Sequence, residues 1–162
     1  MQNPDLVLYI KSQRDTQYSA STSQRLSASD GYLFFKLYDE ALREIDACED
    51  DVEPVRLSRG RVLLHAKRYQ EVVDLCDQEW TNHGQEMSAE FFVQRAFALR
   101  MLGLVSQADE AIESVPARIR QLGVIEYNLG CFEAQLGSEE AAREFISDAL
   151  GINGSLKPNI RK

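Results

Sequence analysis

The sequence has few cysteines and histidines and no long apolar run. Its three cysteines, Cys48, Cys76 and Cys131, lie far apart and form no CxxC pair, so neither a zinc site nor a disulfide framework is indicated. The N-terminal part offers only the apolar run 6–10, which is too short for a signal-peptide core or a membrane span. We therefore expect a cytoplasmic protein with reduced cysteines.

Positive charge is also in deficit. The 162 residues include 18 Lys and Arg against 26 Asp and Glu, for a net charge of -8. Binding to nucleic acid depends on clustered basic residues, and an acidic surface is repelled by anionic membranes, so we expect neither partner. The charge is explained by solubility alone, or else by preference for a basic partner. The apolar share of 44% is ordinary for a globular domain.

No set of residues typical of catalysis is present. His65 and His83 stand in unrelated contexts, and no glycine-rich phosphate loop occurs. The acidic run 49–51 lacks the alternating oxygen ligands and the glycine of a calcium loop. We expect no enzymatic activity, no cofactor and no metal.

The strongest signal is self-similarity between segments of the chain. Its clearest copy is residues 127–150, whose pattern predicts a helix, a glycine-containing turn and a second helix. A shift of 34 positions places Gly137 on Gly103 and Gly130 on Ala96. The same shift aligns three further small or apolar pairs: Ala142 with Ala108, Ile146 with Ile112, and Ala149 with Val115. The sequence therefore predicts repeated helix pairs.

A helix–turn–helix period of this length resembles the tetratricopeptide repeat family. In that family, small residues sit where the paired helices cross, which corresponds here to Ala96 or Gly130 in the first helix and Ala108 or Ala142 in the second. An upstream copy, residues 60–76, has Tyr69 and Val72 in the matching order, with Lys67 in place of the turn glycine. An earlier copy, residues 32–45, carries a Tyr-x-Glu-Ala signature at 38–41, but its first helix is poorly marked.

The resemblance implies an all-α fold, an α-solenoid of antiparallel helix pairs in a right-handed superhelix. We expect one domain over residues 21–154, with pairs at 21–51, 53–86, 89–122 and 123–154. Residues 1–20 are expected to be loose or to cap the first helix, and 155–162 to form a short tail or partial capping helix. Pro54 should lie in a first turn and Pro116 should end a helix early, while 81–85 should be a loop. The expected helices are 22–36, 39–49, 54–67, 69–80, 87–102, 106–115, 119–136 and 139–151.

In tetratricopeptide proteins the first helix of each pair lines a concave groove that holds a partner. The resemblance assigns this role to nine residues: Leu57, Arg61, Leu64, Val93, Phe97, Arg100, Tyr127, Asn128 and Cys131. One subclass binds a chain-end carboxylate through basic and amide residues at these positions, but only Asn128 matches that pattern. We instead expect an extended or helical peptide with apolar anchors, and an acidic side chain for Arg61 or Arg100.

These inferences predict an interaction module or adaptor that binds a protein or peptide partner. Two alternatives remain open: a small acidic export or secretion-type chaperone, and a structural repeat protein that associates with itself through an uncapped end. An enzyme or small-molecule regulator, with Tyr127, Arg100 and Arg61 in a pocket, is the least supported because no acid, base or nucleophile set accompanies them.

Overall fold

The computed structural model describes residues 18–120, 122–135 and 137–152, and every regular element in these ranges is a helix. In chain order the helices are α1 (Ala20–Phe34), α2 (Tyr38–Asp46), α3 (Glu53–His65), α4 (Tyr69–His83), the 3-10 helix η2 (Gly84–Glu86), α5 (Ala89–Met101), α6 (Val105–Glu113), α7 (Ala117–Arg120), α8 (Val124–Gln135) and α9 (Glu139–Ile152). None of these helices combines the length and the apolar character needed to cross a membrane.

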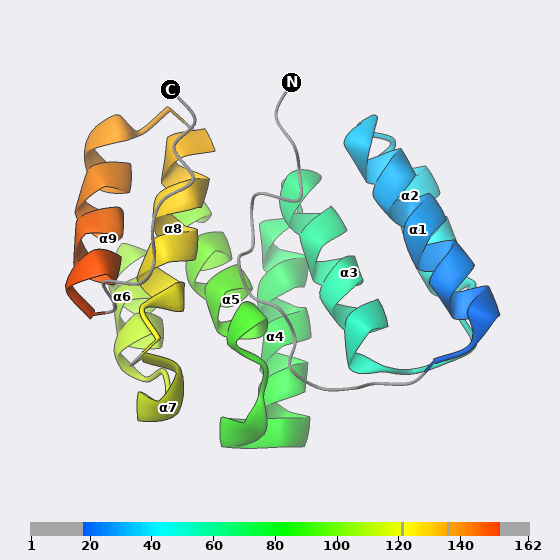
Figure 1. Ribbon diagram of the computed structural model, residues 1–162, viewed down its shortest axis with the longest axis horizontal. Helices are drawn as coiled ribbons and strands as arrows, with labels where there is room; N and C mark the ends of the chain where they lie inside the picture. The colour runs from blue at the N-terminus through cyan, green and yellow to red at the C-terminus, as the bar shows by residue number, and fades with distance from the viewer. Residues whose placement is uncertain (1–17, 121, 136, 153–162) are drawn as a thin grey trace.

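The helices stand in one row along the longest axis of the molecule, from α1 and α2 at one end to α8 and α9 at the other (Figure 1). Helices joined by a short turn pack on each other, as α1 does on α2, α5 on α6 and α8 on α9. The helices α1, α3, α5 and α8 also contact one another in that order. We call the side of the molecule that these four form the first-helix face.

Four of the turns share one backbone geometry. The turn residue has φ of 60° at Lys36 and Lys67, 78° at Gly103 and 81° at Gly137. At each turn, the backbone N–H of the turn residue donates to the carbonyl oxygen of the residue three positions earlier. The N–H of the following residue donates to the carbonyl oxygen five positions before that residue. All eight distances are 2.9–3.1 Å. This is the Schellman motif, which satisfies carbonyls left open at a helix end. Lysine at two of these turns costs about 1 kcal/mol each relative to glycine, because its Cβ opposes the left-handed conformation.

Small residues recur at fixed distances from these turns. Seven positions before each turn residue stand Ser29, Gly60, Ala96 and Gly130, and five positions after it stand Ala41, Val72, Ala108 and Ala142; all eight are buried. A Cβ added to Gly130 of α8 would lie 2.6 Å from Ile146 Cγ1 and 3.2 Å from the Ala142 carbonyl oxygen of α9. The helices α8 and α9 therefore cross at a distance that only small side chains permit.

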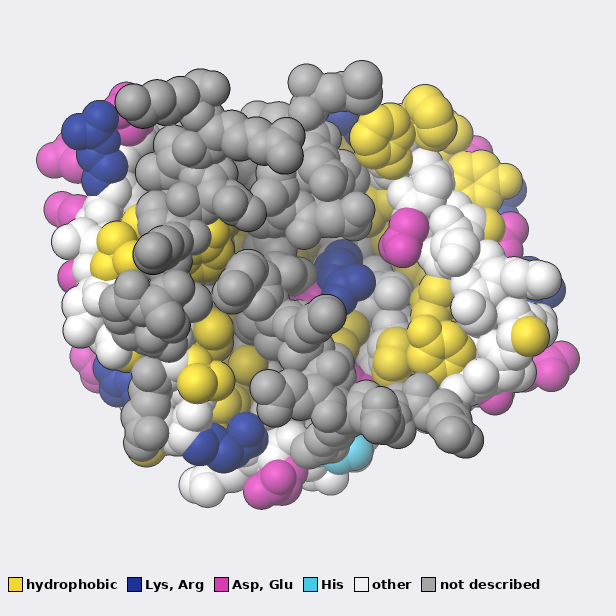
Figure 2. Space-filling model, in the orientation of Figure 1, with side chains coloured by type: hydrophobic (Ala, Val, Ile, Leu, Met, Phe, Trp, Pro, Cys, Tyr) yellow, Lys and Arg dark blue, Asp and Glu magenta, His cyan; other side chains and the backbone are white. Residues whose placement is uncertain are grey.

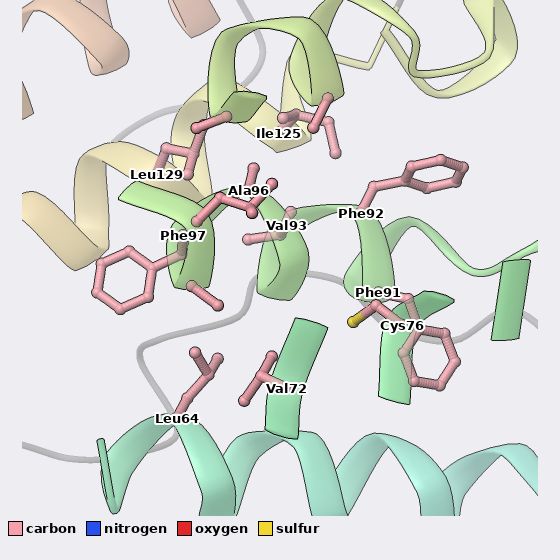
Figure 3. Close-up of a cluster of buried hydrophobic side chains, with 14 of the residues drawn as sticks. Leu64, Val72, Cys76, Phe91, Phe92, Val93, Ala96, Phe97, Ile125 and Leu129 are labelled. Atoms are coloured by element: carbon pink, nitrogen blue, oxygen red, sulfur yellow. The ribbon is translucent and has the colours of Figure 1, made fainter. Parts of the chain in front are cut away.

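The core centres on α5, which sends apolar side chains in all directions (Figure 3). Phe91, Val93 and Ala96 are at most 1% exposed, as expected for a helix surrounded by other helices. Around them pack buried residues of α3, α4, α6 and α8, including Leu64, Val72, Cys76 and Leu129. A smaller cluster, formed by Leu26, Leu33, Ala41, Ile45, Val55 and Val62, joins α1, α2 and α3.

Most expected helices are present, with two corrections. The expected helix 119–136 is wrong at its start, because Gly123 takes a φ of 66° and separates α7 from α8. The expected loop 81–85 is also wrong, because α4 continues to His83 and η2 follows. The roles of the prolines are confirmed, since Pro54 lies in the first turn of α3 and α6 ends before Pro116. The expectations for 1–17 and 155–162 fall outside the described residues.

The crossing geometry predicts opposite effects for two glycine substitutions. Gly130→Ala should lower the free energy of unfolding by about 1–3 kcal/mol, because backbone atoms of α9 must move to admit the methyl group. Gly31→Ala, in α1, should raise it by about 0.5–1 kcal/mol, because nothing lies within 4 Å of the added Cβ and alanine favours helix. Urea denaturation of both variants measures this, and a Gly130→Ala protein as stable as the wild type would contradict the close crossing.

Candidate partner-binding surface

The nine residues expected to line a groove differ widely in exposure. Leu57, Leu64, Val93, Phe97, Tyr127 and Asn128 are buried, whereas Arg61, Arg100 and Cys131 are partly exposed. Asn128 uses its amide to donate to the Val124 carbonyl at 2.7 Å, and burial raises the pKa of the Cys131 thiol. Contact between a partner and the buried six remains a prediction.

Phe97 is buried because its ring packs between aromatic side chains of two other helices. Its ring stacks on Phe132 of α8, with centroids 4.2 Å apart and planes inclined by 25°. Its other neighbour is Tyr69 of α4, in an edge-to-face contact at 6.3 Å. Phe97 therefore holds α5 between two helices, and its truncation would cost stability as well as any binding.

Arg61 of α3 forms a two-pronged ion pair with Glu90 of α5. Arg61 Nε donates to Glu90 Oε1 at 2.6 Å and Nη2 donates to Oε2 at 3.0 Å. Gln94 lies beside this pair and donates through Nε2 to the Leu57 carbonyl at 3.3 Å. A Cβ on Gly60 would lie 1.9 Å from Gln94 Oε1, so glycine at this position makes room for the amide. The helices α3 and α5 are thus joined by a polar network.

The carboxylate in this network is almost wholly removed from water. Only 1% of the Glu90 side chain is exposed, against 36% for Arg61. Burial raises the pKa of the Glu90 carboxyl, and this effect outweighs the opposing attraction of Arg61. The ion pair fixes how α3 lies against α5 but adds little net stability, because desolvation offsets most of the attraction.

Arg100 of α5 has a similar position one helix further along. Its Nη2 lies 2.7 Å from Glu133 Oε1 of α8, and its guanidinium lies 5.1 Å from the ring centre of Phe145 in α9. Both expected groove arginines therefore already have a carboxylate partner within the protein. An acidic side chain of a binding partner would have to compete with Glu90 or Glu133.

The first-helix face is hollowed between α1 and α3, and Figure 2 shows this side of the molecule, with hydrophobic side chains among polar ones over α1. The hollow has a volume of about 240 Å³. Apart from Tyr18, the described residues that line it occupy four matching positions in each of two helices: six, three and two residues before Ser29 or Gly60, and one residue after it. These residues are Ser23, Leu26, Ser27 and Asp30 of α1, and Pro54, Leu57, Ser58 and Arg61 of α3. We call this site the α1–α3 hollow.

Two of the expected groove residues, Leu57 and Arg61, belong to this hollow. The α1 half was missed because the first helix of the earliest copy carries no clear apolar stripe. The signal that would have found it is the distance from Ser29 to Lys36 and Ala41, which equals that from Gly60 to Lys67 and Val72. With this spacing, Leu26 is aligned with Leu57, and Asp30 is aligned with Arg61.

A second pocket of about 240 Å³ lies among α4, α5 and α6. Trp80, which is 45% exposed, meets Phe92 edge to face in its wall, with ring centres 6.1 Å apart. The two charged lining residues are paired with each other, since Arg95 Nε donates to Asp77 Oδ1 at 2.8 Å. This pocket offers aromatic surface, but it contains none of the residues that the repeat pattern assigns to binding.

Comparisons with protein-family models, with curated proteins and with solved structures found no match. The tetratricopeptide resemblance thus rests on the residues of the chain alone. Its support is the common spacing of small residues and turns across four segments of the chain.

The buried carboxylate predicts a definite pH dependence. Because the folded protein binds the Glu90 proton more tightly than the unfolded chain, the free energy of unfolding should fall as pH rises from the ordinary glutamate range through the raised pKa. Glu90→Gln removes this titration, so its stability relative to the wild type should increase over the same interval. Urea titrations at several pH values measure the difference, and Glu71→Gln is the control, because Glu71 forms an exposed ion pair with Arg68. A difference that moves in the opposite direction would mean that attraction to Arg61 exceeds desolvation.

Proposed function

We propose that this chain is a tetratricopeptide-type α-solenoid of antiparallel helix pairs that binds a peptide segment of another protein on its first-helix face. The α1–α3 hollow is the site at which an anchoring side chain of that segment enters. The proposal includes a cytoplasmic location, which is supported by the three free cysteines. The role of an export chaperone remains a narrower prediction within this proposal.

The observation that carries the proposal is the composition of the hollow. Its apolar part consists of the partly exposed Pro54 and of Leu26 and Leu57, which are 9% and 2% exposed at its base. Serine hydroxyls surround it on both helices and can bond the backbone of an extended peptide. Concave sites that combine a small apolar surface with a few convergent polar groups are typical of binding sites.

The net charge adds a preference to this geometry. A protein with a net charge of -8 attracts basic partners at long range and repels acidic ones. In addition, Arg61 already forms an ion pair with Glu90. A segment with an apolar anchor and basic flanking residues therefore fits better than an acidic one.

Filling the hollow should abolish binding without unfolding the protein. Ser27 is exposed on α1 and lines the hollow, so Ser27→Arg places a long side chain in the space that the anchor needs. Gln24 is exposed on the same helix but does not line the hollow, which makes Gln24→Arg a control with the same added charge. Each variant is immobilised, exposed to lysate of the source cell, and compared with the wild type by quantitative mass spectrometry.

We expect a partner that the wild type and Gln24→Arg retain equally and that Ser27→Arg retains at least roughly tenfold less, or about 1.4 kcal/mol weaker. Circular dichroism should show unchanged helicity in both variants. Equal retention by all three proteins would place the binding surface elsewhere and contradict the proposal.

Self-association is a second candidate, because the end of α1 exposes an apolar patch. The patch comprises Tyr32, Phe34, Phe35 and Leu37, of which Phe35 is 71% exposed. Exposed apolar clusters of this kind mark contact surfaces. If the patch joins two copies, sedimentation analysis should show a mass that rises with protein concentration for the wild type and stays monomeric for Phe35→Asp. A wild type that is monomeric at every concentration would remove this candidate.

A further inference from the structure

We propose that the pocket among α4, α5 and α6 is a second binding site, which takes an arginine side chain from a basic segment of another protein. This pocket shares no lining residue with the α1–α3 hollow. The inference therefore goes beyond the proposed function and does not depend on it.

The acidic charge of this protein is concentrated on α2, α4, α6 and α9, the helices that follow the four turns. These helices carry 15 acidic side chains and two arginines. The helices α1, α3, α5 and α8 carry five acidic side chains and six arginines. A basic partner is therefore attracted most strongly to the helices that follow the turns.

Two of these acidic helices, α4 and α6, form walls of the pocket. Neither of them contains a lysine or an arginine. The acidic side chains of α6 all belong to exposed residues, namely Asp109, Glu110 and Glu113. A cation that enters the pocket therefore lies between two helices of negative charge.

The lining of the pocket suits the two parts of an arginine side chain. Met87, Phe92 and Ala111 are buried and form an apolar base, which matches the methylene stem of an arginine. Trp80 is far more exposed, at 45%, and its indole ring lies in the wall. Indole is the aromatic group that attracts a cation most strongly, and a planar guanidinium also stacks on it. An arginine can therefore bury its stem and place its charged end against Trp80.

Asp77 provides the carboxylate that orients the guanidinium. Its side chain is 55% exposed, and its Oδ1 accepts from Arg95 Nε at 2.8 Å. A carboxylate has about four acceptor positions, so Oδ2 can accept from a second guanidinium while Oδ1 keeps its bond to Arg95. Arg95 thus holds the carboxylate in the wall of the pocket.

The test uses the tryptophan of the pocket as its reporter. The chain contains a single tryptophan, so tryptophan emission reports on this pocket alone. The full chain is titrated at low salt with a fluorescein-labelled oligo-arginine peptide, whose anisotropy gives the affinity, and with the unlabelled peptide for the emission. We expect binding that changes the Trp80 emission and weakens as salt is added. Oligo-glutamate and neutral oligo-serine peptides should not bind.

Two pairs of variants separate the pocket from the general charge. Asp77→Asn should weaken the oligo-arginine peptide at least roughly tenfold. Asp74→Asn removes the same charge from an exposed residue of α4 outside the pocket, and should weaken it less than about twofold. Ser114→Tyr narrows the pocket without a change of charge and should also weaken binding. Ser106→Tyr, at an exposed position of α6 outside the pocket, should not. Circular dichroism checks that all four variants fold.

Equal weakening by Asp77→Asn and Asp74→Asn would overturn the proposal, because binding would then depend on net charge alone. The absence of binding at low salt, an unchanged Trp80 emission, full affinity of Ser114→Tyr, or equal binding of the neutral peptide would also overturn it. None of these variants alters a residue that lines the α1–α3 hollow. Failure of this test therefore leaves partner binding at the hollow intact, and failure of Ser27→Arg to reduce capture leaves this pocket intact.

Discussion

The structure depends on how closely the two helices on either side of each turn can cross. The crossing is set by one small residue before the turn and one after it, twelve positions apart, as in Gly130 and Ala142. At Gly130 there is no room for a methyl group without movement of the backbone of α9. Because the helices lie so close, neighbouring helices also come within reach of one another's long side chains, and the core can be continuous from α3 to α8.

Ion pairs between neighbouring helices share one pattern. In each, the arginine stands on α1, α3 or α5 and the carboxylate on an adjacent helix: Arg25 with Glu44, Arg59 with Asp46, Arg56 with Glu79, Arg95 with Asp77, Arg61 with Glu90 and Arg100 with Glu133. The exposed pairs contribute little to stability. The buried ones have a different effect, because a carboxylate such as that of Glu90 is tolerated only where its partner can reach it. They therefore select one arrangement of α3, α5 and α8 over its alternatives.

Much of the helical organisation follows from the sequence, because small residues, turns and prolines act locally. The period that relates Gly137 to Gly103 locates α5, α6, α8 and α9, and Pro54 locates the start of α3. Lys36 obscures where α1 ends, which was expected at 36 and is at Phe34, because lysine is not expected at positive φ. For the candidate site, the repeat identifies which helix carries Leu57 and Arg61 but not what covers them. The burial of Val93 and the pairing of Arg61 with Glu90, 29 residues away, depend on contacts between helices, and no local pattern encodes those.

The position of the hollow can be explained by side-chain size along the first-helix face. At the positions six before, two before and one after the small crossing residue, α1 has Ser23, Ser27 and Asp30, and α3 has Pro54, Ser58 and Arg61. In α5 the same positions hold Glu90, Gln94 and Phe97, which fill the space toward α3 and α8 with an ion pair, an amide and a stacked ring. In α1 these three positions hold only the short side chains of Ser23, Ser27 and Asp30, which leave the space toward α3 unfilled. The side chains of α5 therefore fill the space toward α3 and α8, whereas a hollow remains between α1 and α3, and it is there that we propose a segment of a partner binds.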